Sequence, residues 1–238
     1  MMAPTIAYCG LPPTPAELAL AWNLDPPLLV LLLVVGILVA RQAIDRTTGW
    51  VAWSLLVVVF VSPLCALTAA LFSARVLHHV VLVALVAPLL VRAFVLPTVR
   101  FAPAAALFLG HWIVLWLWHV PGPYAWALDT VAGYWLMQAT LLVSATLLWC
   151  EILRGPPGRA LGLLVGTIGQ MGLLGALLVF APQPLYLVHL ATTAPWGLTP
   201  LADQQLAGVV MWVPAMLPYL AVALARGWRV LDEAEPAR

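Results

Sequence analysis

The arginines of this chain are confined almost entirely to alternate gaps between seven long apolar runs. Nine of the ten arginines follow the first, third, fifth or seventh run, and there is no lysine. Basic residues near the ends of membrane spans are retained on the cytoplasmic side, so short loops rich in arginine mark the inner face. The pattern therefore predicts an all-α polytopic membrane protein, a seven-transmembrane-helix bundle with its N-terminus outside and its C-terminus cytoplasmic.

The composition excludes an ordinary soluble domain. Of the 238 residues, 64% are hydrophobic and only 8% are charged, and the net charge is +1. Seven helices of about 20 residues take up about 140 residues, which leaves short loops and two tails. The small net charge gives no indication of a nucleic-acid partner.

The apolar runs divide the chain into a tail, a membrane domain and a second tail. We assign residues 1–25 to an outer N-terminal tail, 26–225 to the transmembrane domain and 226–238 to a cytoplasmic C-terminal tail. Three prolines inside spans each remove a backbone donor and favour a kink. They are Pro63, Pro88 and Pro214. A stripe of glycines along the sixth span predicts close helix packing. The seven spans are placed at residues 26–40, 50–72, 74–96, 101–118, 130–150, 160–181 and 205–225.

The three cysteines are far apart in the sequence and show no CxxC spacing. Cys9 is expected outside and Cys150 near the inner face, so these two cannot form a disulfide. Cys65 lies about 10 Å below the outer end of the second helix, counting 1.5 Å per residue. We expect Cys65 to act as a small buried hydrophobic residue.

All five histidines fall in the outer half of the predicted bundle or in its outer loops. Ionisable groups inside lipid are costly and usually face the bundle interior or a wet cavity, so the clustering predicts a polar cavity that opens outward. Arg75 and His79 share one helix face, as do Tyr134 and Gln138. Imidazoles at this spacing can chelate a metal, and histidine with methionine would suit copper. The spacing fits equally well with histidines that are hydrogen-bonded within the helix packing. The five are His78, His79, His111, His119 and His189.

Three segments of the chain resemble the CtaG-type cytochrome c oxidase assembly factors, a family of seven-span bacterial membrane proteins. SARVLHHVVLVALVAPLLV, which begins at Ser73, is similar to the family's SAHMxQHLLL…APLLV helix. WLWHVPGPYAWAL, which begins at Trp116, resembles the family's WxxHxPxxYxxAL. WGLTPLADQQLAGVVMWVP, which begins at Trp196, resembles GLSPLxDQQLAGLIMWVP, and the run DQQLAG…MW is the most specific match. The matches cover most of the chain from Ser73 onward.

The resemblance also identifies individual positions. His79 and His119 match family histidines and are the candidate metal ligands. The family's first histidine in the HxxxH motif of the third helix is Arg75 here. A second HxxxH motif, on the fifth helix, appears as Tyr134 and Gln138, so this chain resembles a divergent member that retains only part of any copper site. A guanidinium beside His79 would also repel a copper cation. The candidate partner or motif residues are Arg75, Tyr124, Asp203, Gln204, Gly208 and Trp212.

The resemblance implies an assembly factor for a haem–copper cytochrome c oxidase of the respiratory chain, located as a multi-pass protein in the bacterial inner (plasma) membrane. It would act at the periplasmic membrane face by copper handling or by holding an immature subunit. The implied partners are oxidase subunits and membrane lipid, and copper is the candidate cofactor. The sequence contains no nucleophile–base constellation, phosphate loop or HExxH motif, so we do not predict an enzyme.

Two alternatives remain open from the sequence. The protein could be a stable accessory subunit or docking partner within an oxidase complex, which the lost histidines favour. It could also be a b-type membrane cytochrome, because bis-histidine haem ligation needs two imidazoles on facing helices at equal depth. His78 or His79 with His111 is the only plausible pair, and no second pair lies near the inner face.

The order of the spans also predicts a meeting point. His79, His119 and Asp203 each lie where a span begins or ends on the outer side, so we expect them to converge there. The alternative role of Asp203 is to cap the last predicted helix, where a carboxylate interacts favourably with the helix dipole.

Overall fold

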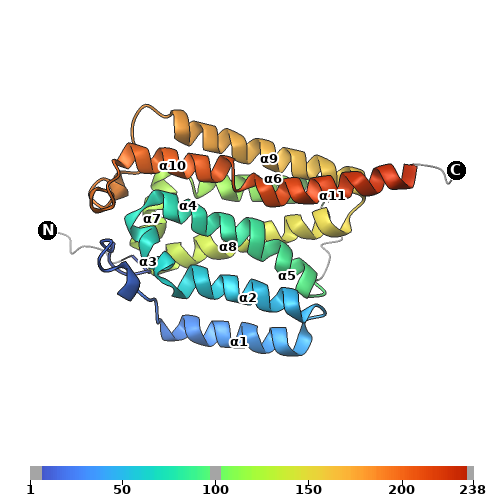
Figure 1. Cartoon of the computed structure of the whole chain (residues 1–238), viewed down its shortest axis with the longest axis horizontal. Coiled ribbons are helices and arrows are strands. Elements are labelled where there is room, and N and C mark those ends of the chain that lie inside the picture. Colours follow the sequence, from blue (N-terminus) through green and yellow to red (C-terminus); the bar gives the residue numbers. More distant parts are fainter. Residues whose placement is uncertain (1–6, 97–102, 235–238) are drawn as a thin grey trace.

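The computed structural model of the chain describes residues 7–96 and 103–234, and these form long helices that run side by side along one axis (Figure 1). No strand occurs in this part of the chain. Single-turn 3₁₀ segments lie at Leu18–Leu20, Leu187–His189 and Ala194–Trp196. The longer helices are α1 (Pro26–Gln42), α2 (Arg46–Val61), α3 (Pro63–Ala70), α4 (Phe72–Val80), α5 (Ala87–Ala93), α6 (Ala104–Leu117), α7 (Pro121–Asp129), α8 (Val131–Arg154), α9 (Pro157–Phe180), α10 (Pro200–Trp212) and α11 (Met216–Ala234).

The predicted all-α class with several apolar spans is confirmed, and the described part of each predicted span lies mostly on helix; residues 101 and 102 of the fourth span lie outside the described residues. Within the described residues, four helical stretches are long and apolar enough to cross a membrane, and the number rises to six if each bent helix pair is one span. The helix α1 is a shorter apolar helix of 17 residues. The protein is therefore a multi-pass membrane protein, whereas the count of seven spans and the orientation stay predictions.

The second and fourth predicted spans each belong to a helix pair bent by more than 40°, and the seventh is interrupted at residues 213–215, between α10 and α11. The second is broken at Ser62 and Pro63, where α2 and α3 meet at 48°. Pro63 has no N–H to donate and opens α3, and the Ser62 hydroxyl accepts from the N–H of Leu64 at 3.2 Å. The fourth is followed by α7, which turns by 72° inside the segment expected to be an outer loop.

The helix formed by α4, a π-helical segment at Val81–Val86 and α5 lies at the centre of the bundle. In the π register the N–H of Ala87 donates to Leu82, so the carbonyl of Val83 would need the N–H of Pro88, which does not exist. The indole Nε1 of Trp149 on α8 donates to the Val83 carbonyl instead, at 2.9 Å. The sequence predicted a kink at Pro88, and the structure shows a π-helical segment supported by a buried tryptophan.

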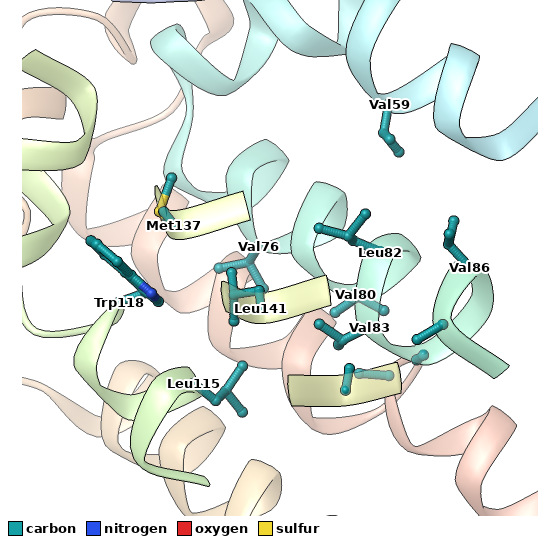
Figure 2. Packing of buried hydrophobic residues seen from close by; sticks show 14 of the residues in the cluster. Val59, Val76, Val80, Leu82, Val83, Val86, Leu115, Trp118, Met137 and Leu141 are labelled. Atoms are coloured by element: carbon teal, nitrogen blue, oxygen red, sulfur yellow. The ribbon is translucent and has the colours of Figure 1, made fainter. Parts of the chain in front are cut away.

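The core is built around this central helix. Figure 2 shows its valines and Leu82 packed between Val59 of α2, Leu115 and Trp118 at the end of α6, and Met137 and Leu141 of α8. These side chains are almost completely buried. The polar side chains on the first two turns of the central helix are therefore enclosed by neighbouring helices.

The two ends of the bundle differ in chemistry. The end that carries the C-terminus of α5 and the N-terminus of α9 is called here the arginine end. Arg154 donates to the carbonyls of Val91, Phe94 and Leu96, at 2.8–2.9 Å, and Arg226 donates to those of Ile152 and Leu153. These bonds satisfy carbonyls left free at helix C-termini. The helix α11 also continues to Ala234, beyond the boundary predicted at residue 225.

The opposite end, called here the histidine end, carries His78, His79, His119 and His189. The tail at residues 7–25 and the loop at residues 182–199 lie over this end (Figure 1). The indole of Trp196 in the loop donates to the carbonyl of Pro13 in the tail, at 3.1 Å.

Candidate functional site

The first two turns of the central helix place three polar side chains together at the histidine end. His78 and His79 follow Arg75 by about one turn of α4, and each of these three residues is at most 2% exposed. The ring of His79 lies 5.9 Å from that of His78 and 5.8 Å from that of His119, which follows α6. We call Arg75, His78, His79 and His119 the buried cluster.

The N-terminal tail closes the buried cluster from the side of α8. The guanidinium of Arg75 lies over the ring of Tyr134, 5.3 Å from its centroid, and Tyr8 of the tail stacks on the same ring at 4.6 Å. The Tyr8 hydroxyl donates to Asp25 at 2.6 Å, the residue that caps α1. The tail expected as a simple extension outside the membrane is therefore part of the wall of the site.

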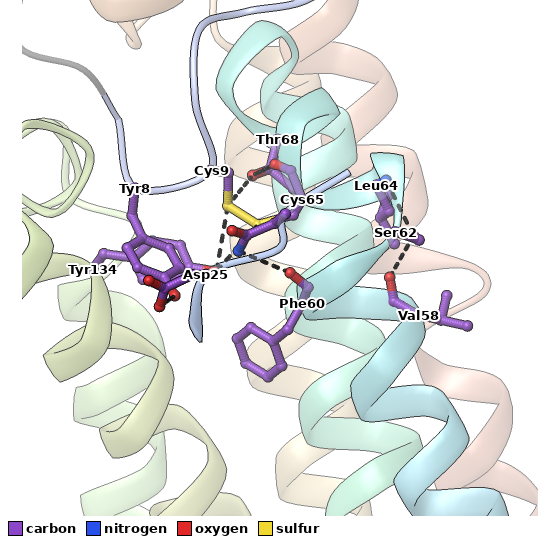
Figure 3. The surroundings of a disulfide bond; sticks show 11 residues. Tyr8, Cys9, Asp25, Val58, Phe60, Ser62, Leu64, Cys65, Thr68 and Tyr134 are labelled. Atoms are coloured by element: carbon purple, nitrogen blue, oxygen red, sulfur yellow. Dashed lines mark hydrogen bonds between the residues drawn. A yellow bond between two sulfur atoms is a disulfide. The ribbon is translucent and has the colours of Figure 1, made fainter. Parts of the chain in front are cut away.

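A disulfide between Cys9 and Cys65 fixes this tail (Figure 3). The expectation that Cys65 is only a small buried hydrophobic residue was wrong, because the tail folds back over α3 and brings Cys9 to it. The hydroxyl of Tyr134 lies 3.5 Å from Sγ of Cys9 and 3.8 Å from Sγ of Cys65. Asn23 donates to the carbonyl of Phe60 at 3.0 Å and holds the next part of the tail.

Many polar atoms of the buried cluster have no hydrogen-bond partner within the described part of the chain. These atoms are both ring nitrogens of His78 and of His79, Nε2 of His119, and Nε and Nη1 of Arg75. On His119, Nδ1 lies 2.7 Å from the carbonyl of Leu115, so Nδ1 carries the proton and Nε2 keeps its lone pair. Gln138, one turn along α8 from Tyr134, is 2% exposed, and its amide also has no partner.

The buried cluster contains few side chains that could coordinate a metal ion. Across residues 7–96 and 103–234, no group of three or more His, Cys, Asp or Glu side chains is placed to hold one. His79 and His119 lie side by side, but Arg75 adds a fixed positive charge one turn from His79. His111 is directed to another partner, since its Nδ1 lies 2.9 Å from the hydroxyl of Ser144 on α8.

A group of aromatic side chains connects the buried cluster to the 182–199 loop. Phe72 stacks on Tyr186 with ring centroids 3.6 Å apart and lies 6.3 Å from the ring of His119. The Tyr186 hydroxyl donates to the carbonyl of His119 at 2.7 Å. Tyr124 and His189 share a hydrogen bond of 2.8 Å between the Tyr124 hydroxyl and Nε2 of His189. The loop is thereby held firmly on the histidine end.

His189 is buried in this loop as a neutral imidazole. Burial lowers the pKa of His189 to about 4, and the nearby charge of Arg75 acts in the same direction. Burial also raises the pKa of Tyr186 above its usual range. Both groups are therefore uncharged at neutral pH.

Asp203 joins α10 to the start of α4. Its carboxylate accepts from the N–H groups of Phe72 at 2.7 Å and Ser73 at 3.2 Å, and from the Ser73 hydroxyl. The expected alternative, a cap on its own helix, was wrong, because Thr199 caps α10 by accepting from Ala202 at 3.1 Å. Asp203 instead supplies the cap that Leu71 cannot provide for α4.

The contacts of Asp203 and Phe72 bring together three predicted site residues. Phe72, which Asp203 caps, lies beside the ring of His119, and His119 lies beside His79. His79, His119 and Asp203 therefore occupy one region of the histidine end, although Asp203 faces the backbone of α4.

The other residues of the DQQLAG…MW segment pack α10 against α9. Gln204 accepts from the N–H of Leu185 at 2.6 Å and donates to the carbonyl of Leu178 at 3.2 Å. A Cβ on Gly208 would lie 2.7 Å from the carbonyl oxygen of Gly175, so the two backbones touch. Trp212, 39% exposed, packs over this crossing. The segment that is most specific in sequence thus has an internal packing role in the structure.

Only some glycines of the stripe on α9 allow another element to pack closely against this helix. Gly175 touches α10, and a Cβ on Gly166 would lie 3.0 Å from the ring of Phe108. Gly162 and Gly169 have open space where a Cβ would be, with no atom within 4 Å. The packing prediction therefore holds at Gly166 and Gly175.

Sequence reasoning missed Tyr8, Tyr186 and the disulfide. Tyr8 and Tyr186 lie in segments without periodicity, and their contacts depend on how the tail and the 182–199 loop fold back. A signal for the disulfide existed, because Cys9 and Cys65 were both expected toward the same side of the membrane.

Comparison with known proteins agrees with this architecture. Residues 97–233 match the model of the family described as cytochrome c oxidase caa3 assembly factor, Caa3_CtaG. No curated protein and no solved structure matches the chain. The matched range includes α6 to α10, nearly all of α11, and the DQQLAG…MW segment. Because the match covers more than half of the chain, this protein belongs to the cytochrome c oxidase caa3 assembly factor family.

Proposed function

We propose that this protein assists assembly of a haem–copper cytochrome c oxidase by holding an immature subunit at the periplasmic face of the bacterial plasma membrane. Family membership supports the oxidase assembly role, and we propose that this role is non-catalytic. The arginine asymmetry supports a cytoplasmic arginine end and hence a periplasmic histidine end. The disulfide at the histidine end supports the same orientation, because disulfides persist in oxidising compartments.

The observation that carries the holding role is the 182–199 loop, which is rigidly anchored and yet apolar on its surface. Tyr186, Thr192 and Trp196 are each tied by hydrogen bonds to other elements. Leu187 is 69% exposed and Leu190 is 47% exposed. A rigid surface with exposed apolar side chains suits a protein partner, since little ordering is needed on binding.

Deletion and complementation in the source bacterium test this role. Deleting the gene should lower the activity of one haem–copper oxidase and leave its transcript unchanged. Complementation with Leu187→Ser plus Leu190→Ser should fail to restore activity although the protein accumulates normally. Leu20→Ser is the matched control, because Leu20 is 85% exposed on the tail and lies outside the loop. Full restoration by the double variant would refute contact through the loop.

A second candidate is copper handling by His79 and His119. It is favoured by the adjacent rings and by the unpartnered Nε2 of His119. Arg75 opposes it, so we expect weak or no copper binding by the purified protein. Stoichiometric copper that disappears in His79→Ala would favour copper handling over simple holding. Retention in the purified mature oxidase would instead identify a stable accessory subunit.

The orientation has its own test. Ala191→Cys places a thiol on the exposed loop at the histidine end, and Gly158→Cys places one at the arginine end. An impermeant maleimide should label the first in cells whose outer barrier admits it, and the second only after the membrane is opened. The reverse pattern would overturn the proposed periplasmic site.

A further inference from the structure

Arg75 carries a buried charge, and no acidic side chain among the described residues forms an ion pair with it. Its side chain is 1% exposed, and a guanidinium stays protonated in proteins. Among the described residues, the ion pair within 4 Å joins Arg159 and Glu151 at the other end of the bundle. A buried charge without a counter-charge is strongly destabilising.

The neighbouring acidic groups have other partners. Asp203 lies at the N-terminus of α4, but its oxygens accept from Phe72 and Ser73. Asp25 accepts from the Tyr8 hydroxyl and the N–H of Leu28. The hydroxyls of Tyr124 and Tyr134 lie within hydrogen-bond reach of Arg75, and its guanidinium lies over the face of Tyr134. These neutral groups compensate the charge only in part, because a hydroxyl or a cation–π contact is weaker than a charge pair.

The unpartnered atoms around Arg75 favour an anion. Nε and Nη1 of Arg75 are N–H donors that lack an acceptor. His78 and His79 follow within one turn, and each neutral imidazole can offer one further N–H, because all four of their ring nitrogens are unpartnered. We propose that Arg75, His78 and His79 bind a small monovalent anion of halide size, such as chloride.

The surroundings limit the size and charge of this anion. Every member of the buried cluster is at most 6% exposed, so a peptide or a lipid headgroup has no access to it. One negative charge neutralises Arg75, whereas a dianion would leave a new uncompensated charge in the same place. Several N–H donors without a competing carboxylate suit a halide, which accepts hydrogen bonds and donates none.

The proposal predicts that chloride stabilises the folded protein. The full-length protein in detergent is unfolded thermally in sodium chloride, sodium bromide or sodium gluconate at equal ionic strength. We expect a saturable rise of several degrees in the melting temperature with chloride and bromide, but not with the bulky gluconate. In Arg75→Gln the halide response should be lost, whereas Arg159→Gln, which changes an exposed arginine, should keep it.

A second measurement covers the case in which Arg75→Gln does not fold. Crystals of the wild-type protein grown in bromide should show an anomalous peak within hydrogen-bond distance of Arg75. Equal melting curves in all three salts, or a peak replaced by water, would overturn the anion site. These readouts do not depend on oxidase activity, so the anion site and the proposed function fail independently.

Discussion

The carboxylate of Asp203 on α10 accepts a hydrogen bond from the backbone N–H of Phe72, the first residue of α4, at 2.7 Å. The two residues are separated by 131 positions in the sequence, so one side chain ties the last part of the bundle to its central helix. The buried cluster begins one turn further along α4. The position of Arg75 and the histidines therefore depends on this contact.

Asp203→Ala should destabilise the protein by about 2–3 kcal/mol, because two buried N–H groups and a hydroxyl lose a charged acceptor. Thr199→Ala is the matched control on the same helix, and loss of that ordinary cap should cost about 1 kcal/mol. Unfolding in mixed micelles, followed by tryptophan fluorescence, measures both variants. Equal losses would show that the link to α4 adds nothing beyond a local cap.

Gly208→Ala should separate α9 from α10. The added Cβ would meet the Gly175 carbonyl oxygen at 2.7 Å, and backbone cannot move aside as a flexible side chain can. We expect a loss of about 1–3 kcal/mol in the free energy of unfolding. Gly169→Ala on α9 is the control, since its Cβ meets no atom within 4 Å and alanine has the higher helix propensity.

Replacing both Cys9 and Cys65 by serine should release the tail from the histidine end. The bond closes a segment with a sequence separation of 56, for which chain entropy gives about 4 kcal/mol of stabilisation. Limited proteolysis should then cut the tail between residues 10 and 24, and the melting temperature should fall. Cys150→Ser, which changes the free buried cysteine, should leave the tail resistant. A tail that stays protected in the double variant would mean that Tyr8 and Asn23 hold it without the bond.

Acid should weaken the attachment of the 182–199 loop. The folded-state pKa of His189 is about 4, below the unfolded value of about 6.5, so the unfolded state binds more protons between these pH values. The stabilisation is complete above pH 6.5 and is lost as the pH falls toward 4, on the order of 3 kcal/mol. His189→Gln should flatten this part of the stability–pH curve, measured by thermal unfolding from pH 7.5 to 4. An unchanged slope in the variant would assign the acid sensitivity to other groups.

The helices could be predicted from the sequence because each apolar run is long and is bounded by arginine or proline. The arginine pattern also located the histidines at one end, and the structure brings His79 and His119 together there. The breaks were harder to predict. Pro88 predicts a defect, but the π-helical segment depends on Trp149, which lies far along the chain and supplies the missing donor.

The structural role of the DQQLAG…MW segment could not be predicted from the sequence pattern either. An acidic residue in the first turn of a helix fits a local cap, and only the placement of α4 beside α10 makes Asp203 a cap for another helix. The contacts of the tail with α3 and α8 could not be predicted either, because they join residues that no local periodicity relates.

The disulfide also sets an order for folding. Cys9 precedes α1 and Cys65 lies beyond α2, so the two sulfur atoms can meet only once α1 and α2 have packed as a hairpin and the tail has folded back over α3. The bond therefore locks the α1–α2 hairpin at its open end, where the tail and α3 meet.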